Sequence, residues 1–337
     1  MKKILYINTV SSVFNIPFWK AFEALGFEVH FVDWRGHPFL EIGNLIHRTV
    51  QKLPEKMRDY LNVQANKKID ERVLEAAKKV KPDYIFVHKA KYIATPVLDE
   101  LRSIATTINW YPDILNNLGT IERIIDHYDY LFNYDRYMVD LFRGRGYKNF
   151  YHLPWAADLD KNAVWPDKRD YKYNVVFIGS YNPQIFPREE ELKDLKDLGL
   201  HVWGNKAWLK TALKDCYHGF IQPRMDEIQK VYKESKIGLY FDSLYDVPAS
   251  GVTLRPFEIT SGGAMMLGQV FREEMPELWV DRKEYASFNG PDDLREKIAY
   301  YLKHEDERRE MAKNGFERTR RDHTYYDRIK KIFEIVG

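Results

Sequence analysis

The segment 250–263, which reads SGVTLRPFEITSGG, combines residue types that could bind a phosphorylated ligand. It lies between two short apolar runs that are typical of buried strands. Pro256 suits the first turn of a helix, where its missing N–H costs nothing. The residues just before this turn would present free backbone amides at the positive end of the helix: Gly251, Val252 and Thr253. Such an end binds phosphate, and Arg255 would add a fixed cation beside it.

The same segment also has a purely structural interpretation. Glu258 in a first helical turn is often only a dipole partner that contributes about 0.3–1 kcal/mol. The pair Gly262–Gly263 is often only a helix cap. The position of this segment in the fold favours the ligand-binding interpretation. The helix follows a predicted strand, and ligands of doubly wound folds bind at the carboxyl ends of strands. The sequence therefore predicts a phosphate-binding site here.

The first half of the chain alternates predicted strands and helices. Apolar runs predict strands over Lys3–Asn8, Glu28–Asp33, Asp83–His88, Thr106–Trp110, Tyr130–Asn133 and Asn149–Leu153. Helical spacing predicts a helix over Pro17–Leu25, and residues 41–80 read as two or three helices. Such β–α–β units imply a parallel sheet with right-handed crossovers.

The second half repeats this α/β pattern. Strands are predicted over Asn174–Ile178, Leu200–Trp203, Ile237–Phe241 and Ala264–Leu267. Helices are predicted over 188–198, Met225–Ser235, 291–303 and about 305–333. The stretch Asp160–Asp170 is polar, contains Pro166 and lacks periodicity, which predicts a linker. We therefore expect an N-terminal domain over 1–158 and a C-terminal domain over 159–317.

Composition excludes several protein classes. The chain has 337 residues, enough for about two domains of roughly 150 residues each. Its net charge of +2 argues against a dedicated duplex-DNA-binding protein, so no nucleic-acid partner is expected. The apolar runs are far shorter than the ~20 residues of a membrane span. The single cysteine, Cys216, and a start that leads directly into a strand predict a cytoplasmic protein without a signal peptide.

Motifs of other enzyme classes are missing from the sequence. It contains no Gly-x-Gly-x-x-Gly, no Walker-type loop, no His-Glu-x-x-His and no cysteine spacing that would hold a metal ion. Nicotinamide-dependent dehydrogenases, P-loop ATPases and zinc hydrolases are therefore disfavoured.

Several motifs together resemble one family. They are Thr253-x-Arg255-x-Phe257-Glu258-x-x-x-x-Gly263, Asp322-His323-Thr324-Tyr325-x-x-Arg328, Val176–Ser180, Val202–Gly204 and Glu234–Leu239. Their order and spacing, over most of residues 130–330, resemble the CgeB-like glycosyltransferases of the spore-maturation-protein type. The resemblance implies the GT-B fold, in which two Rossmann-like domains face each other across a cleft. It also implies a C-terminal helix, over about 318–337, that crosses back to the first domain.

This resemblance implies a glycosyltransferase of the hexosyltransferase type that uses a UDP-sugar or GDP-sugar as co-substrate. Glu258 would accept hydrogen bonds from the ribose hydroxyls, and the amides before its helix would hold the diphosphate. The region Phe220–Arg224 would lie beside the base. The full set of expected donor-binding residues is Gly179, Ser180, Gly204, Ile221, Arg224, Gly251, Val252, Thr253, Arg255 and Glu258.

One position departs from the family pattern. Many retaining members carry a second glutamate eight positions before the first, and this chain has Ser250 there. This departure is the main support for one alternative, a non-catalytic nucleotide-sugar-binding protein on the same scaffold. A different enzyme of that scaffold, such as a nucleotide-sugar epimerase, is a second alternative.

The first domain would offer the acceptor, which is a glycan, a lipid-linked or a protein hydroxyl. Asp113 and His88 follow or end predicted strands, so either side chain could act as general base. The alternatives are a turn at Asp113 and a buried structural His88.

No metal or cofactor is expected beyond the nucleotide sugar. Backbone amides and Arg255 could stabilise the leaving diphosphate without a metal ion. Asp158-Leu159-Asp160 matches the Asp-x-Asp string of metal-dependent transferases, but its place in the linker favours a turn. A packing role is expected for His323. The basic cluster Arg318, Arg320 and Arg321 is expected to be a solvated face, and attraction to the inner face of a membrane is the alternative.

Overall fold

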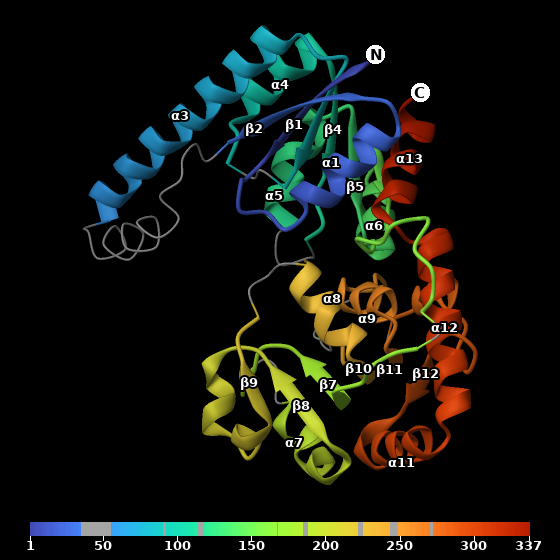
Figure 1. Cartoon of the computed structure of the whole chain (residues 1–337). Helices are drawn as coiled ribbons and strands as arrows, with labels where there is room; N and C mark the ends of the chain where they lie inside the picture. Colours follow the sequence, from blue (N-terminus) through green and yellow to red (C-terminus); the bar gives the residue numbers. More distant parts are fainter. Residues whose placement is uncertain are drawn as a thin grey trace. The chain divides into compact units, whose positions relative to one another are not determined.

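The computed structural model of the chain divides into two compact units (Figure 1). Unit 1 comprises Met1–Leu153 and Ile332–Gly337, and unit 2 comprises Pro154–Lys331. The structure describes residues 1–34, 55–89, 92–113, 118–166, 168–184, 188–221, 225–242, 249–269 and 272–337.

Unit 1 contains a six-stranded parallel sheet with the order β2-β1-β3-β4-β5-β6. Its strands are β1 Lys3–Asn8, β2 Glu28–Asp33, β3 Tyr84–His88, β4 Thr106–Trp110, β5 Tyr130–Asn133 and β6 Phe150–His152. The predicted α/β class and parallel sheet are confirmed for this half. Because all strands run in the same direction, their carboxyl ends meet at one edge.

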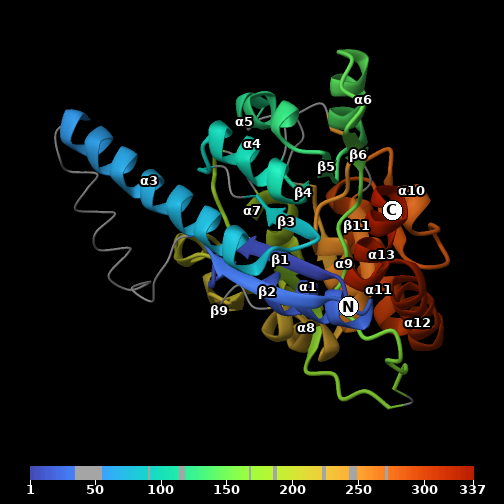
Figure 2. The same cartoon turned by 90° about the horizontal axis from the view of Figure 1, so that it is seen from above.

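The helices of unit 1 connect these strands. They are α1 Asn15–Ala24, α3 Glu55–Val80, α4 Thr95–Ile104, α5 Leu118–Ile124 and α6 Arg136–Gly144, with a 3-10 turn, η2, over Ile125–His127. The sequence predicts two or three helices over 41–80, interrupted by Pro54, and the described part after that proline forms one helix over 55–80. Residues 41–54 lie outside the described residues. Helix α3 extends well beyond the sheet in both views (Figures 1 and 2).

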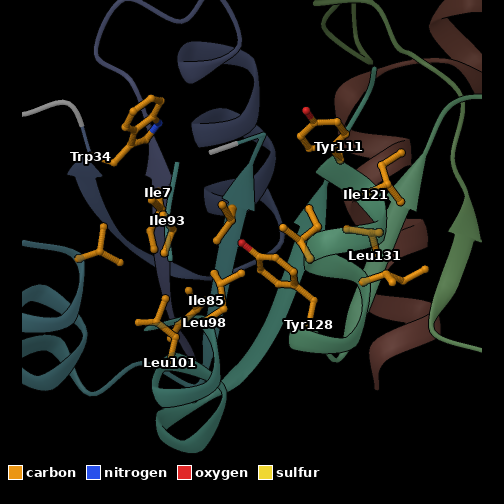
Figure 3. Close-up of a cluster of buried hydrophobic side chains, with 14 of the residues drawn as sticks. Ile7, Trp34, Ile85, Ile93, Leu98, Leu101, Tyr111, Ile121, Tyr128 and Leu131 are labelled. Atoms are coloured by element: carbon orange, nitrogen blue, oxygen red, sulfur yellow. The ribbon is translucent and has the colours of Figure 1, made fainter. Parts of the chain in front are cut away.

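The hydrophobic core of unit 1 is formed by side chains from its strands and from the helices packed on them. Figure 3 shows Ile85 and Leu131 from the strands together with Leu98 and Leu101 from α4 and Ile121 from α5. All five are almost fully buried. Each such side chain contributes about 1.5–3 kcal/mol relative to its exposed state. This packing fixes the helices on the sheet and thereby the loops at its carboxyl edge.

Unit 2 also contains a six-stranded parallel sheet, with the order β12-β11-β10-β7-β8-β9. Its strands are β7 Tyr173–Ile178, β8 Leu200–Trp203, β9 Tyr217–Gly219, β10 Ser235–Tyr240, β11 Met265–Gln269 and β12 Ala286–Phe288. The sequence predicts four of these strands. It misses β9 and β12, which have only three residues each and stand at the two edges of the sheet.

Short and long helices cover unit 2. They are α7 Glu189–Leu192, α8 Met225–Lys233, α9 Arg255–Gly262, α10 Met275–Leu278, α11 Gly290–Lys303, α12 Glu305–Asp322 and α13 Tyr325–Val336, with the 3-10 turns η3 Lys193–Leu198, η4 Lys206–Lys210 and η5 Lys214–Cys216. The predicted helix over 188–198 is thus α7 followed by η3. Across the described helices, none combines the length and hydrophobicity that a membrane crossing requires.

The last helical region breaks between α12 and α13. The Thr324 amide donates to Asp327 Oδ2 over 2.9 Å, and the Asp327 amide donates to Thr324 Oγ1 over 3.3 Å. This reciprocal cap starts a new helix. The end of α13 belongs to unit 1, where the Phe333 ring lies 4.4 Å from Phe27 and 5.0 Å from Tyr84, centroid to centroid. As expected, the C-terminal helix returns to the first half of the fold.

Candidate functional site

The strand order of unit 2 creates a switch point between β7 and β10. The chain passes from β7 to β8 and β9 on one side, and then returns to β10 on the other side. In open α/β sheets, ligands bind at the carboxyl edge beside such a point. Gly179 and Ser180 follow β7 directly, and the segment that leads into α9 follows β10. The fold therefore places these predicted residues at one edge.

Helix α9 begins without a side-chain cap. Its N-cap residue, Leu254, makes no capping hydrogen bond, and Pro256 occupies the first turn as expected. Gly251 and Val252 are buried, yet within the described part of the chain no group accepts a hydrogen bond from their backbone amides. Buried backbone amides almost always have an acceptor. These two amides are therefore available to one that comes from outside the chain.

An ion pair closes the first turn of α9. Arg255 Nη1 lies 2.5 Å from Glu258 Oε2, and the side chains are 25% and 8% exposed, respectively. Burial raises the pKa of Glu258 above its ordinary value, and the guanidinium of Arg255 opposes this effect. In this structure, Arg255 is thus the counter-ion of Glu258.

Two buried tyrosines pack beside this turn. Tyr232 interacts electrostatically with Arg255 and Glu258, and Tyr240 lies against Thr253. Burial raises the pKa of both phenols, so both stay protonated at neutral pH. Tyr232 therefore provides a neutral hydroxyl group next to the Arg255–Glu258 pair, and Tyr240 provides one next to Thr253.

Gly179 is half-buried, and Ser180 is exposed at the end of β7. A Cβ at position 179 would lie 2.6 Å from the Phe177 ring, so a larger residue requires that ring to move. The Gly179 carbonyl accepts a 2.8 Å hydrogen bond from Trp208 Nε1. The hydrogen bond from Trp208 therefore fixes the backbone of Gly179, and the Phe177 ring leaves little room for a side chain there.

The packing of the backbone requires a glycine at position 204. A Cβ there would lie 2.0 Å from the Gly179 carbonyl oxygen, a contact that no side chain can make. Of the two residues predicted beside the base, Ile221 is half-buried. Arg224 lies outside the described residues.

A buried salt bridge fixes the ends of the connection between β10 and α9. Arg272 donates to both carboxylate oxygens of Asp242, with an Nη2–Oδ1 distance of 3.0 Å, and also to the Ala249 carbonyl. Arg188 donates to the Asp242 carbonyl. All three charged side chains are buried. Arg272 therefore ties Asp242, two residues after β10, to Ala249, which directly precedes the segment that leads into α9.

Ser250 contacts a carboxylate from a later part of the chain. Its hydroxyl donates to Glu274 Oε1 over 2.7 Å, and both residues are buried. The chain lacks a glutamate at position 250, yet it brings a buried acidic group to the same place.

The sequence reasoning missed Asp242, Arg272 and Glu274. A signal existed, since Asp242 and Arg272 each follow a predicted apolar strand by a few residues. Because β10 and β11 are neighbours, their carboxyl ends bring opposite charges together.

His88 lies at the carboxyl end of β3 in unit 1, as predicted. It is 2% exposed, and the rings of Phe14 and Phe18 lie 4.8 and 5.2 Å away. Burial, together with Lys89, lowers the pKa of His88 to about 3, so its imidazole is neutral. Its Nε2 atom has no hydrogen-bond partner among the described residues. This environment fits the structural interpretation of His88 better than the catalytic one.

Asp113 follows β4 and is partly exposed. Lys89 Nζ lies 2.9 Å from Asp113 Oδ1. The Asn133 amide donates to the carbonyls of Tyr111 and Asp113, at 2.6 and 2.9 Å, and so fixes this turn. The carboxylate is therefore held at the carboxyl edge of the sheet with a cation beside it.

His323 is buried, as its expected packing role requires. Its Nε2 lies 2.8 Å from the Leu278 carbonyl, and Arg328 Nη2 lies 3.1 Å from its Nδ1. We infer that Nε2 carries the proton and Nδ1 accepts. Burial and Arg328 lower the pKa of His323 to about 4.

The basic cluster on α12 is paired. Arg318 and Arg321 contact Asp322, and Arg320 contacts Glu317. These ion pairs reduce the positive charge available to a membrane surface. In the linker, Asp160 Oδ1 accepts from the Asn162 amide in a turn. Among the described residues, no group of three or more His, Cys, Asp or Glu is placed to hold a metal ion.

A comparison with known protein families finds a match in the second half of the chain. Residues 188–334 match a family described as "Glycosyl transferase-like". This match runs from α7 into α13 and includes the whole segment that leads into α9. Among curated proteins, none matches the chain.

Solved structures resemble the whole chain. Sucrose-phosphate synthase from Thermosynechococcus elongatus has a TM-score of 0.67 at 11% identity, covering 100% of this chain and 99% of that one. HepE from Anabaena, in complex with UDP and glucose, has a TM-score of 0.61 at 13% identity, with coverages of 100% and 99%. A Listeria monocytogenes protein provisionally named UDP-N-acetylglucosamine 2-epimerase has a TM-score of 0.58 at 12% identity, with coverages of 100% and 98%. At these identities the likeness concerns the fold, which is the GT-B fold that the sequence predicts.

Proposed function

We propose that the protein is a glycosyltransferase of the hexosyltransferase type. It would move a sugar from a UDP-sugar or GDP-sugar to a hydroxyl acceptor, without a metal ion. Unit 2 would bind the donor, and unit 1 would offer the acceptor. It would be of the CgeB-like type. The match of residues 188–334 to a family described as "Glycosyl transferase-like" supports a transferase.

The observation that carries this proposal is the start of α9. The buried residues Gly251 and Val252 have backbone amides without an acceptor among the described residues, and they precede a helix whose first turn holds Arg255 and Glu258. A diphosphate would satisfy these amides at the positive end of the helix. The Glu258 carboxylate would then accept hydrogen bonds from ribose hydroxyls.

The chemistry of the reaction fits these groups. When the sugar leaves, negative charge grows on the nucleoside diphosphate. Fixed amides and a guanidinium stabilise that charge without reorganising. The glycine after β7 would let the backbone approach the phosphates, as Gly179 carries no side chain there.

The acceptor hydroxyl must lose a proton. Asp113 is our candidate for the general base, since it stands partly exposed at the carboxyl edge of the unit 1 sheet. A glycan, a lipid-linked or a protein hydroxyl would serve as acceptor. The buried, neutral His88 is the weaker candidate.

The direct test is release of nucleoside diphosphate from a panel of UDP-glucose, UDP-N-acetylglucosamine and GDP-mannose, with a metal chelator present. A transferase releases the diphosphate slowly to water and faster once an acceptor is added. If no nucleotide sugar binds or reacts under any condition, the proposal is wrong.

The epimerase alternative rests on the fold likeness to the Listeria protein. It predicts conversion of UDP-N-acetylglucosamine without any acceptor, which proton NMR of the sugar detects. The non-catalytic alternative rests on Ser250 and predicts tight binding with no turnover.

A further inference from the structure

A cavity lies in unit 2, away from the start of α9. It has a volume of about 460 Å³, within the range of small-molecule sites. Its floor is the C-terminal end of α9, at Ser261, Gly262 and Gly263. That end leads into the first residue of β11, so the cavity lies toward the amino edge of the sheet. The donor site described above lies at the opposite, carboxyl edge.

One wall of this cavity is entirely polar. Asp226, Gln229, Lys230 and Lys233 line it from one face of α8, at helical spacing. Gln229 already donates to the Asp158 carbonyl over 2.6 Å and to Ser261 Oγ over 3.2 Å. The side-chain amide is thus fixed in orientation, and no described residue donates a hydrogen bond to its carbonyl oxygen, which can therefore accept one.

Another part of the lining, here called the apolar wall, consists of apolar side chains. It consists of linker residues that include Val164, Trp165 and Pro166, together with Phe316 from α12. The rings of Trp165 and Phe316 meet edge to face at 5.6 Å. Val164 is 83% exposed at the rim, although it is an aliphatic side chain. A ligand with a hydrocarbon surface would cover this wall.

The linker wall is anchored firmly. Arg169 donates to the carbonyls of Lys233 and Gly262, at 2.6 and 2.9 Å, and also to Gly263, so one guanidinium binds the ends of α8 and α9. A cation at a helix C-terminus interacts favourably with the dipole. The hydrogen bonds of Arg169 therefore fix the linker against the ends of α8 and α9, which line the cavity.

Charge selects the ligand. Three cationic residues line the cavity against one acidic residue: Arg169, Lys230, Lys233 and Asp226. Arg169 is engaged by backbone carbonyls, whereas Lys230 and Lys233 are exposed and make no ion pair with any described residue. Two free ammonium groups at one rim favour an anionic substituent.

The polar wall distinguishes between two classes of ligand, an acyl chain and a sugar ring. A simple acyl chain would cover the amide and the charged groups of α8 without satisfying their hydrogen bonds, which is costly. A sugar ring presents C–H groups on its faces and hydroxyl groups around its rim, so it matches one apolar and one polar wall.

We propose that this cavity binds an acidic carbohydrate, with its ring against the apolar wall and its anionic group at Lys230 and Lys233. It would be an accessory glycan site, separate from the donor site. The inference does not depend on the proposed transferase activity.

Saturation-transfer NMR with glucuronate and glucose tests this directly, because the two sugars differ only in the carboxylate at C6. The titration uses the full chain with saturating UDP, which occupies any nucleotide site. Glucuronate is expected to bind more tightly than glucose. The double variant Lys230→Glu/Lys233→Glu should weaken glucuronate binding about tenfold or more and leave glucose unchanged.

Two further variants make the test specific. Ala163→Phe fills the cavity and should abolish binding of both sugars, whereas Lys210→Glu changes an exposed lysine elsewhere in unit 2 and should change neither. UDP affinity should stay the same in all of these variants, so failure here is distinguishable from failure of the transferase proposal. The inference is overturned if glucuronate does not bind, if its binding is unaffected by these substitutions, or if dodecyl phosphate alone occupies the cavity.

Discussion

Arg255 Nη1 lies 2.5 Å from Glu258 Oε2, so one turn of α9 holds both charges of the candidate donor site. The pair has two consequences. It allows an acidic side chain to be buried at a helix start. It also fixes the carboxylate in the helical turn that follows Gly251 and Val252, whose amides have no acceptor among the described residues. The geometry of the site is thus fixed before a ligand arrives.

Removal of Arg255 alone should destabilise unit 2. Arg255→Gln leaves the Glu258 carboxylate buried without its cation, which should cost about 2–3 kcal/mol, less than for a fully buried pair because Arg255 is partly exposed. The double variant Arg255→Gln/Glu258→Gln should regain most of this loss. Urea unfolding of the three proteins at neutral pH measures it, and equal stability of the single variant and wild type would contradict the account.

Gly204→Ala should destabilise the edge of the second sheet. The new Cβ would lie 2.0 Å from the Gly179 carbonyl oxygen and 2.8 Å from Trp208 Nε1, so backbone must move at a cost of about 1–3 kcal/mol. Gly144→Ala is the matched control, since a Cβ there meets nothing within 4 Å. Thermal unfolding should show a lower Tm for the first variant only. A Tm equal to that of wild type would disprove the close contact.

Asp113→Asn tests the general base. If Asp113 takes the acceptor proton, kcat should fall at least about 100-fold while UDP affinity stays unchanged. Lys89→Gln breaks the same ion pair but keeps the carboxylate, so it should retain most of the activity. Unchanged turnover in Asp113→Asn would remove this residue from the mechanism, and an equal loss in both variants would indicate a structural role.

Stability should fall in mild acid because of two buried histidines. The unfolded chain binds a proton at each near pH 6.5, whereas the folded chain does so only near the pKa of about 4 for His323 and about 3 for His88. Protons therefore favour the unfolded state as pH falls through this window. Each histidine should cost about 2 kcal/mol at pH 5 relative to pH 7.

Urea unfolding at these two pH values measures this loss. His323→Gln should reduce the difference between pH 7 and pH 5, because one of the two groups is gone. A free energy of unfolding that does not change between the two pH values would contradict the assigned environments.

The sequence predicts what depends on local pattern. Apolar runs locate four strands of unit 2, but Tyr217–Gly219 and Ala286–Phe288 are too short to produce a pattern and become strands only by pairing at a sheet edge. The break before α13 could be predicted, because Thr324 and Asp327 stand at the spacing of a capping box, in which each side chain accepts from the backbone amide of the other residue.

The contacts of the candidate site likewise fall into those that the local sequence predicts and those that depend on the fold. Arg255 and Glu258 lie one turn apart on α9, so their sequence spacing predicts their proximity. The partners Arg272 and Glu274 come from beyond β11 and reach Asp242 and Ser250 only through the fold. Periodicity cannot reveal such contacts, since they depend on which strands become neighbours.

The most direct test of the central claim is calorimetric titration of UDP and GDP into wild-type protein and Glu258→Gln. We expect one diphosphate to bind the wild type at a single site. Loss of the buried carboxylate should weaken this binding at least about tenfold, since a hydrogen bond to a charged group contributes about 1.5–3 kcal/mol. Arg255→Gln/Glu258→Gln should bind at least as weakly, since it also lacks the guanidinium beside the diphosphate. Its stability should be close to that of wild type, which excludes misfolding as the cause. Affinity near the wild-type value for both nucleotides in both variants would contradict the assignment of this site to the donor.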